Sequence, residues 1–397
     1  MCFAHRTIPP RPSVRGFPRD NVKILVVTPT YAENPTSGGV LVTHERIEQL
    51  RQVGEVTVLC VHADSANPVI GLIKAGHLKP RTPSVLLGSY INREPLSVWR
   101  NHTKALLNAA DSLASESWDL VYCDHWLMWP AASRVPAKKR VLHLHNAEHV
   151  LFARAAAHLP RLSSMLANIE AHRVQRYLQR ACQAADEVHL LSSADAQILA
   201  NDAILGDTPT LVFTPACERK HFEQANAAGR QGALTVGSLS WEPTRLGLTW
   251  FMQEVRSGIQ DLPLTVIGKG APASLTLMLA NDPAVTALGF IDDLDPYYAR
   301  AKCFIAPLLD GSGIKIKILN ALARGIPVVT TPVGVEGFPA GFESCVRVAY
   351  TPQSFAEQVA RVEALSDAEW EDLSRKGQHY VQTHFSGAAW AQWCANR

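Results

Sequence analysis

Short apolar runs alternate with helical patterns along the chain, which predicts an α/β fold. Residues 23–30 (KILVVTPT) and 55–62 (EVTVLCVH) are apolar runs of strand length, typical of buried parallel strands. Between them, residues 40–54 carry apolar side chains at helical spacing. The three segments form a βαβ unit, and the loop that precedes its helix contains Gly38 and Gly39. These glycines lie where a first-strand ligand loop belongs, although a flexible turn explains them equally well.

The same alternation continues and divides into two halves. In the first half, strands are expected at residues 119–123, 140–145, 187–191 and 210–214, with helices at 95–117 and, broken near Pro160, at 147–185. In the second half, strands are expected at residues 233–236, 264–268, 285–288, 303–307, 328–330 and 345–348, with helices at 243–257 and 314–324. The sequence therefore predicts two doubly wound domains, residues 21–214 and 233–384, joined by a polar linker at 215–232.

The two ends of the chain differ from these domains. Residues 1–20 are rich in Arg and Pro and lack the apolar core of a secretory signal, so we interpret them as an extension. Residues 385–397 carry Trp390 and Trp393 at helical spacing. We expect this last helix to use both aromatic rings as anchors and to pack back on the N-terminal domain.

Composition narrows the class of protein. The chain has 397 residues and a net charge of +2, which argues against a nucleic-acid binder that works by bulk charge. Its eight cysteines are scattered without close pairs, as in a cytosolic protein with reduced, buried thiols. No apolar run reaches the roughly 18 residues needed to span a bilayer. A cytoplasmic location is therefore expected.

The stretch DGSGIKIKILNALARGIPVV has the form of an anion pocket. A turn with Gly311 and Gly313 precedes a helix, and the free N–H groups at a helix start attract anions. Lys315 and Lys317 add positive charge beside this turn. A solvated helix face is the plain alternative for each lysine, and the adjacent glycines favour phosphate binding for at least one of them.

Four segments resemble one family. They are GSGIKIKILNALARGIPVVTTPVGVEGF, VGSLSWEPTRLGLTWF, SGGVLVTHERIEQL and HLHNAEHVLFARAA, and they resemble retaining glycosyltransferases of family 4 in a bacterial subset. The resemblance runs from about residue 23 to the C-terminus. It implies the GT-B fold, in which two Rossmann-like domains face each other across a cleft. It also implies transfer of a hexosyl group from a nucleotide-sugar with retention of configuration.

The resemblance carries a set of donor-binding residues onto this chain. Backbone groups of the glycine-rich turns would meet the diphosphate, the lysines would offset its charge, and Lys317 would also stabilise the leaving group. The set comprises Gly38, Gly39, Ser238, Gly311, Ser312, Gly313, Ile314, Lys315, Lys317, Asn320, Gly334, Glu336 and Gly337.

Three positions depart from the family pattern. Asn320 stands where a glutamate usually receives the ribose hydroxyls, and Ser312 stands where a first glutamate is usual. Arg245 is the one basic residue in a loop where relatives carry an Arg and Lys pair, which leaves the lysines as the phosphate ligands. Asparagine still accepts a hydrogen bond, without the added strength of a charge.

The N-terminal half would supply the acceptor side of the cleft. His145 ends a strand and is the second catalytic candidate, because imidazole can relay a proton near neutral pH. Further acceptor-side candidates surround it in the sequence: Asp124, His125, Asn146 and His149. A packed or surface histidine and an ordinary strand-end loop are the plain alternatives.

Neither a metal nor a cofactor is expected, because no DxD element in a suitable loop and no His/Cys ligand pattern stands out. The expected partners are a nucleotide-sugar and a hydroxyl acceptor of a polysaccharide, glycolipid or metabolite, with no nucleic acid. The protein is expected to be a monomer or homodimer. Peripheral contact with the inner face of the membrane is a further possibility, carried by basic residues: Arg154, Arg161, Arg173, Arg176 and Arg180.

Two other functions remain open. The same fold could serve a nucleotide-sugar epimerase or hydrolase, although the several cleft carboxylates that epimerisation needs cannot be placed in the sequence. Asn320 and Ser312 also leave room for a degenerate homologue that binds a sugar nucleotide without turnover.

Overall fold

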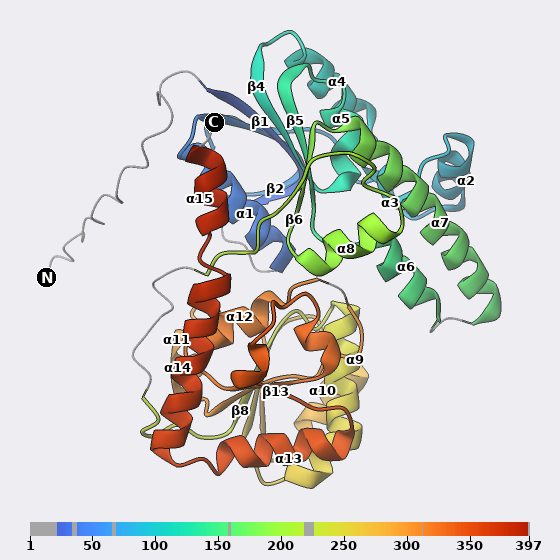
Figure 1. The fold of residues 1–397 in the computed structure, drawn as a ribbon. Helices are drawn as coiled ribbons and strands as arrows, with labels where there is room; N and C mark the ends of the chain where they lie inside the picture. Colours follow the sequence, from blue (N-terminus) through green and yellow to red (C-terminus); the bar gives the residue numbers. More distant parts are fainter. Residues whose placement is uncertain are drawn as a thin grey trace, which may run out of the picture.

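The computed structural model describes residues 22–33, 38–65, 69–157, 160–217, 226–311 and 313–395. The predicted extension at residues 1–20, residues 218–225 of the predicted linker, and Ser312 lie outside this part of the chain. Within it, the chain forms two stacked α/β domains that meet along one side of each sheet (Figure 1).

In the N-terminal domain, the described strands form a parallel sheet in the order β3-β2-β1-β4-β5-β6-β7. The strands are β1 Lys23–Ala32, β2 Glu55–Asp64, β3 Leu72–Lys74, β4 Trp118–Asp124, β5 Ala137–Leu144, β6 Glu187–Leu190 and β7 Thr210–Val212. The helices are α1 Gly38–Arg51, α2 Pro83–Ile91, α3 Leu96–Asn101, α4 Lys104–Leu113, α5 Trp129–Ala132, α6 Glu148–Ala157, α7 Arg161–Ala184 and α8 Ser193–Asn201, with a short 3-10 turn, η1 Trp126–Met128. The central strands are buried on both faces, as their near-continuous apolar sequences require.

The C-terminal domain repeats this design with the order β10-β9-β8-β11-β12-β13 among its described strands. The strands are β8 Ala233–Val236, β9 Leu264–Ile267, β10 Val285–Leu288, β11 Cys303–Ala306, β12 Val328–Thr330 and β13 Val346–Val348. The α-helices are α9 Glu242–Trp250, α10 Ala273–Ala280, α11 Asp295–Arg300, α12 Ile316–Ala323, α13 Pro352–Glu363, α14 Asp367–His384 and α15 Ala388–Ala395. Shorter helical turns are η3 Phe251–Val255, η4 Arg256–Ile259, η5 Pro332–Val335 and η6 Phe342–Ser344.

The chain crosses between the domains at two neighbouring places. The Thr214 hydroxyl donates to His384 O at 2.9 Å, and Cys217 N donates to Phe385 O at 3.0 Å. Beyond this point, α15 lies beside α1 of the N-terminal domain (Figure 1). Its Trp390 and Trp393 belong to the apolar core beneath β1, β2 and β4.

Several elements differ from the expectation. The single helix expected at 95–117 is divided into α3 and α4, because Thr103 leaves the helical conformation and accepts a hydrogen bond from Leu106 N. Helix α2 was not expected at all. The helix expected at 314–324 begins at Ile316, because Lys315 has extended backbone angles and occupies the N-cap position.

Candidate active site

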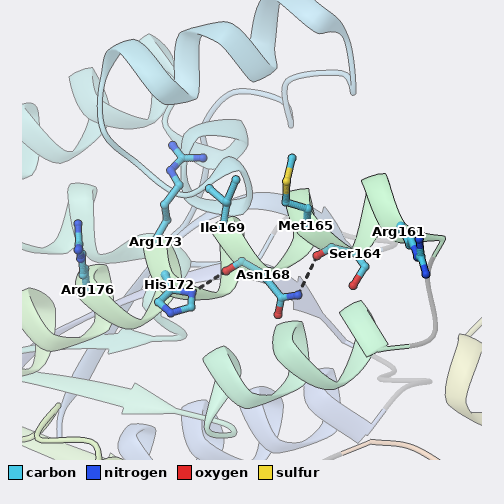
Figure 2. Close-up of a pocket in the computed structure, with 8 residues that line it drawn as sticks. All are labelled: Arg161, Ser164, Met165, Asn168, Ile169, His172, Arg173 and Arg176. Atoms are coloured by element: carbon cyan, nitrogen blue, oxygen red, sulfur yellow. Dashed lines mark hydrogen bonds between the residues drawn. The ribbon is translucent and has the colours of Figure 1, made fainter.

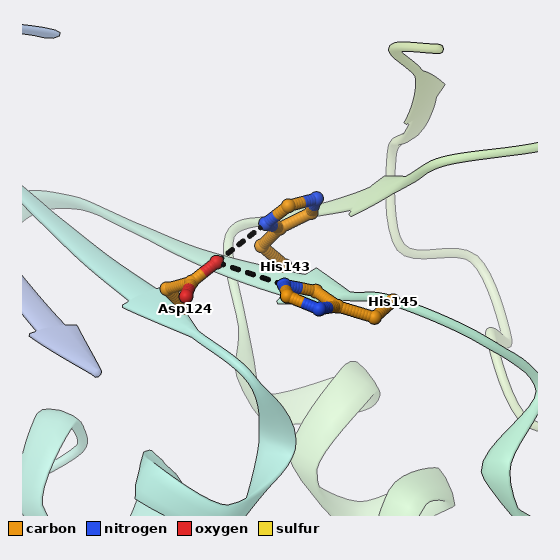
Figure 3. A group of neighbouring side chains, drawn as sticks. All are labelled: Asp124, His143 and His145. Carbon is orange, nitrogen blue, oxygen red and sulfur yellow. Dashed lines mark hydrogen bonds and ion pairs between the residues drawn. The ribbon is translucent and has the colours of Figure 1, made fainter. Parts of the chain in front are cut away.

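Asp124 is the centre of the cluster at the carboxyl end of the N-terminal sheet. Its Oδ1 lies 2.8 Å from His143 Nδ1 and 3.1 Å from His145 Nε2 (Figure 3). Its Oδ2 accepts hydrogen bonds from the hydroxyls of Thr28 at 3.1 Å and Thr43 at 2.6 Å. The carboxylate therefore joins β1, α1, β4 and β5 at one point, and all four of its neighbours hold it by hydrogen bonds.

The electrostatics of this cluster favour a charged His145. Burial works against charge on Asp124, but the two histidines more than offset it, so the pKa of this carboxyl lies well below its usual range. Burial also opposes charge on His145, yet Asp124 and then Glu148 outweigh it and raise the pKa of the imidazole. Burial lowers the pKa of His143 to about 3. One imidazole of the pair is thus favoured as the cation and the other stays neutral.

The other acceptor-side candidates lie around His145 but differ in what they contact. His125 stacks edge-on against it with ring centres 5.3 Å apart, and burial lowers the pKa of His125 to about 3. The Asn146 amide donates to Glu148 at 3.3 Å. His149 lies apart from this cluster, since its Nε2 pairs with Asp202 at the end of α8 at 2.6 Å.

Gly38 and Gly39 lie on the opposite side of the same space. They are the first two residues of α1, so the prediction that they lie in a loop before the helix was wrong. A Cβ on Gly39 would lie 3.8 Å from His145 Nδ1, so the nitrogen that Asp124 does not hold faces the start of α1. A Cβ on Gly38 would lie 3.5 Å from Ile316 at the start of α12. The two glycines, the predicted histidine and the predicted donor helix therefore come together across the domain interface.

The donor half begins at the turn before α12. Gly313 has a φ of +69°, and a Cβ there would collide with the Asn146 side chain of the opposite domain. The Lys315 ammonium donates to Gly313 O at 2.6 Å. Lys317 Nζ donates to Thr244 in α9 at 3.1 Å, and a Cβ on Gly237 would lie 3.1 Å from it. Lys317 thus points at the end of β8, whereas Lys315 lies against the turn that holds Gly311 and Gly313.

Burial lowers the pKa of both lysines to about 8. For Lys315, Glu336 and Asp195 partly counter this effect, whereas for Lys317 the charge of Lys315 adds to it. The two ammonium groups therefore create a region of positive potential, and no carboxylate among the described residues offsets the charge of Lys317 as Glu336 and Asp195 offset that of Lys315. An anionic ligand would reduce the repulsion between the two charges.

The remaining donor-side candidates line the rim. Ser238 follows β8 and shares a hydrogen bond with Ser240 at 2.8 Å. Asn320 lies one helical turn after Lys317 on α12 and is partly exposed. Ile314 is half-buried and packs against the core of the C-terminal domain. Gly311 has a φ of +117° and accepts a hydrogen bond at its carbonyl from Arg154 at 3.1 Å.

Residues 334–337 form the second glycine-rich turn. Gly334 packs on Thr330, where a Cβ has no room, and Gly337 has a φ of +83° and abuts Ser192 of the N-terminal domain. Glu336 Oε2 accepts from Arg154 of α6 at 2.9 Å. Because the Arg154 side chain is more than a third exposed, we assign this ion pair a positional role and little stabilising energy.

Sequence reasoning missed two groups that the structure adds to the site. His143 lies two residues before His145 and opposite Asp124 in the β4–β5 register, so the HLH pattern beside a strand ending in Asp was the available signal. The sequence indicated only that Arg154 is one of several basic residues. No motif in the neighbouring sequence indicated that its side chain reaches the other domain.

Asp124, His143 and His145 are also three possible metal ligands. Their ligand atoms lie within 4.8 Å of one another, and one carboxylate with two imidazoles is a set that zinc or iron accepts. In the structure, however, these ligand atoms are already engaged in hydrogen bonds to one another, and the second Asp124 oxygen is engaged by two threonine hydroxyls. An ion would therefore have to displace these hydrogen bonds. Nε2 of His143 is buried and has no hydrogen-bond partner among the described residues.

Comparison with known proteins finds a family similarity in the C-terminal domain. Residues 230–364 match the family model described as Glycosyl transferases group 1. A relative from Klebsiella pneumoniae, an uncharacterized 44.6 kDa protein in the cps region, is 27% identical over 115 residues, which are 26% of this chain. The match spans only 30% of that relative's own length.

Solved structures resemble the whole chain. Sucrose-phosphate synthase from Thermosynechococcus elongatus has a TM-score of 0.68 at 15% identity, with 94% of this chain and 97% of that chain covered. WaaG, a glycosyltransferase involved in lipopolysaccharide biosynthesis, has a TM-score of 0.67 at 14% identity, with coverage of 94% and 98%. Anabaena HepE in complex with UDP-glucose has a TM-score of 0.62 at 14% identity, with coverage of 94% and 98%.

The two facing Rossmann-like domains are therefore those of the GT-B fold, as the sequence predicted. The family model covers residues 230–364, so the similarity to group 1 glycosyltransferases lies in the C-terminal domain, and the likeness to solved structures over the whole chain shows the GT-B fold.

Proposed function

We propose that this protein is a glycosyltransferase that moves a hexosyl group from a nucleotide-sugar to a hydroxyl acceptor, with retention of configuration and without a metal ion. The observation that carries the proposal is the meeting of three parts in one cleft: the Gly311–Gly313 turn, the two lysines of α12, and His145 held by Asp124. HepE, which shares the fold, is known in complex with UDP-glucose, and this supports a nucleotide-sugar as the donor.

The residues divide the chemical work in a simple way. Lys315 and Lys317 would face the diphosphate, where their charge stabilises the nucleotide as it leaves. The C1–O bond to the phosphate breaks while the acceptor oxygen bonds to C1 on the same face. The acceptor proton passes to the departing phosphate oxygen, so no separate protein base is required. Nδ1 of His145, as a cation, would donate a hydrogen bond to an oxygen of the transferred sugar.

The Arg154 contact adds a positioning role. This side chain reaches from α6 to both glycine-rich turns of the donor half, at Gly311 and Glu336. Closing the cleft brings it there and excludes water from the reacting centre, which limits hydrolysis of the donor.

One assay tests transfer against its alternatives. Purified protein is incubated with UDP-, GDP-, dTDP- and CMP-sugars, with and without acceptor extracts from polysaccharide, glycolipid and metabolite fractions. Nucleotide release that depends on an acceptor is the expected result. Release without acceptor would favour a hydrolase, a changed sugar with no release would favour an epimerase, and binding alone would favour a degenerate homologue. Asn320 keeps the last alternative open, because it lacks the charge of the usual carboxylate.

We also propose a cytoplasmic location with contact to the inner face of the membrane. Within the described residues, no helix is long and apolar enough to cross a bilayer. The support for membrane contact is the basic character of α7, which carries four arginines and one glutamate, and localisation of a tagged protein in intact and lysed cells would test it.

A further inference from the structure

Helices α2 and α7 together present an apolar face to solvent on the N-terminal domain. On α2, Leu87 is 61% exposed and Ile91 is 71% exposed, and Leu86 and Tyr90 are exposed beside them. On α7, the exposed apolar residues are Met165, Leu166 and Ile169. Monomeric proteins seldom leave so many large apolar side chains together in water, which indicates a surface that contacts something.

The two helices form one continuous surface. Arg173 of α7 donates to Ser89 O of α2 at 2.8 Å, and its guanidinium lies 4.1 Å from the centre of the Tyr90 ring. Met165 and Ile169 project from the same side of α7 as Arg173 (Figure 2). They line an open groove of about 700 Å³ whose rim includes Arg161 and Arg176. In Figure 1, α2 and the far end of the α6–α7 pair stand out from the body of the domain.

The charge around this surface is strongly one-sided. On α7, Arg161, Arg176 and Arg180 are exposed, and Glu170 is the helix's one acidic residue. Near α2, the nearest acid in the sequence is Glu94. Both acids are already paired inside the surface: Glu94 with His102 at 2.8 Å, and Glu170 with Arg173 at 2.6 Å. The exposed charges are therefore positive, among them Arg81 and Arg93 at the two ends of α2.

We propose that the α2–α7 surface docks on an anionic lipid bilayer. Apolar side chains surrounded by arginines suit a membrane interface. The apolar side chains would insert among the acyl chains, and the arginines would bind the lipid phosphates. A second copy of the chain fits less well, because a two-fold dimer would set the exposed arginines of one surface against those of the other. The proposal rests on the proposed location at the membrane but not on glycosyl transfer, and a vesicle assay tests it without any substrate.

The experiment measures co-sedimentation of the full-length protein with vesicles of phosphatidylcholine alone, or of phosphatidylcholine mixed with phosphatidylglycerol. Strong binding to the mixed vesicles and weak binding to the neutral ones is expected, with a loss of binding as salt is raised. Leu87→Glu/Ile91→Glu should weaken binding at least about tenfold. Arg161→Ala/Arg176→Ala should weaken it about fivefold for each arginine removed.

Matched controls come from the C-terminal domain. Leu277→Glu replaces a leucine of similar exposure, 62%, on α10, and Arg375→Ala removes an exposed arginine on α14. Both should bind vesicles like the wild type. UDP-sugar affinity and the thermal midpoint of the α2 and α7 variants should stay unchanged, which separates lost docking from lost folding. Equal binding to neutral and mixed vesicles would overturn the proposal, as would a dimer in sedimentation velocity that dissociates in Leu87→Glu/Ile91→Glu while vesicles do not bind.

Discussion

Asp124 organises the acceptor side of the cleft because one carboxylate holds two histidines and two threonines. It fixes the Nε2 of His145, and the Nδ1 faces Gly39 at the start of α1. The same carboxylate raises the pKa of this imidazole against the effect of burial. Asp124 is thus a positioning residue that sets both the orientation and the charge of the catalytic candidate.

Asp124→Asn should change the pH dependence of transfer. If the His145 cation is the active form, activity falls as pH rises through its pKa, and removal of the carboxylate shifts this falling limb to lower pH. The loss of charged hydrogen bonds should also cost about 2–4 kcal/mol of unfolding free energy. A pH profile of kcat/KM, with urea unfolding alongside, measures both effects. An unshifted falling limb in a folded variant would contradict the assignment.

Lys315 and Lys317 should make donor binding depend on pH. Their pKa values of about 8 lie below the ordinary value of 10.5, so above pH 8 a growing share of each is neutral in the free protein. A diphosphate favours the charged form, so binding takes up protons and weakens as pH rises through 8. Calorimetry in buffers of different ionisation enthalpy detects this uptake.

The lowered pKa values of the two lysines also make the free energy of unfolding depend on pH. Because the folded pKa lies below the unfolded one, the unfolded state binds more protons between about pH 8 and 10.5, and stability rises with pH there. Lys317→Ala should remove part of this rise and should weaken donor affinity. Lys376→Ala, on the exposed face of α14, serves as the control. Equal donor titrations of the Lys317 variant and wild type would refute the phosphate role.

Asn320→Glu should strengthen donor binding. The resemblance places a glutamate here to receive the ribose hydroxyls, and a charged acceptor adds about 1–2 kcal/mol over a neutral one. The expected gain is therefore about fivefold to thirtyfold in affinity for the nucleotide-sugar. Asn320→Gln, which extends the side chain without charge, should give no such gain. If both variants bind alike, the ribose does not lie at this position.

At the scale of elements, the sequence predicted those helices and strands whose apolar pattern is local. The buried strands and α12 followed from apolar runs and from Gly325, whose φ of +73° ends that helix. Helix α2 was missed because its outward face is apolar, so PSVLLGSYI shows no polar side to mark a helix. The Asp124 network was missed because the bond from Thr28 to Asp124 joins residues 96 positions apart, which only the sheet order brings together.

Helix α15 packs on the N-terminal domain through its two tryptophans. Trp390 stacks under the Arg46 guanidinium at 3.6 Å from its ring centre, and Trp393 donates to Glu187 at 2.7 Å. Trp393→Ala should destabilise the protein by about 3–5 kcal/mol, from the cavity and the lost partner of a buried carboxylate. Denaturant unfolding measures this loss. Trp241→Ala is the control, because that side chain is exposed in the C-terminal domain.

At the scale of the whole molecule, the domains meet through glycines. Gly313 contacts Asn146, Gly337 contacts Ser192, and Gly38 contacts Ile316. Gly313→Ala should prevent full closure and lower kcat/KM at least about tenfold, because the reacting groups no longer reach their positions. Small-angle scattering with a UDP-sugar should show a more extended variant. Gly229→Ala is the matched control, since Gly229 has a similar φ of +74° and open space around it. Full activity of the Gly313 variant would mean that this contact is not needed in the reacting state.

The glycine contacts also bear on the order of binding steps. Because backbone and side chains pack closely where the two domains meet, a diphosphate would have no path into the site after the domains have closed. If the proposed transfer takes place here, the nucleotide-sugar would have to bind first, on the lysines of the C-terminal half, and the acceptor half would close afterwards. After transfer, the nucleoside diphosphate would leave only when the two domains open again. Domain opening would then limit the turnover rate, and weakening the Arg154 contact, rather than altering His145, would give a faster enzyme.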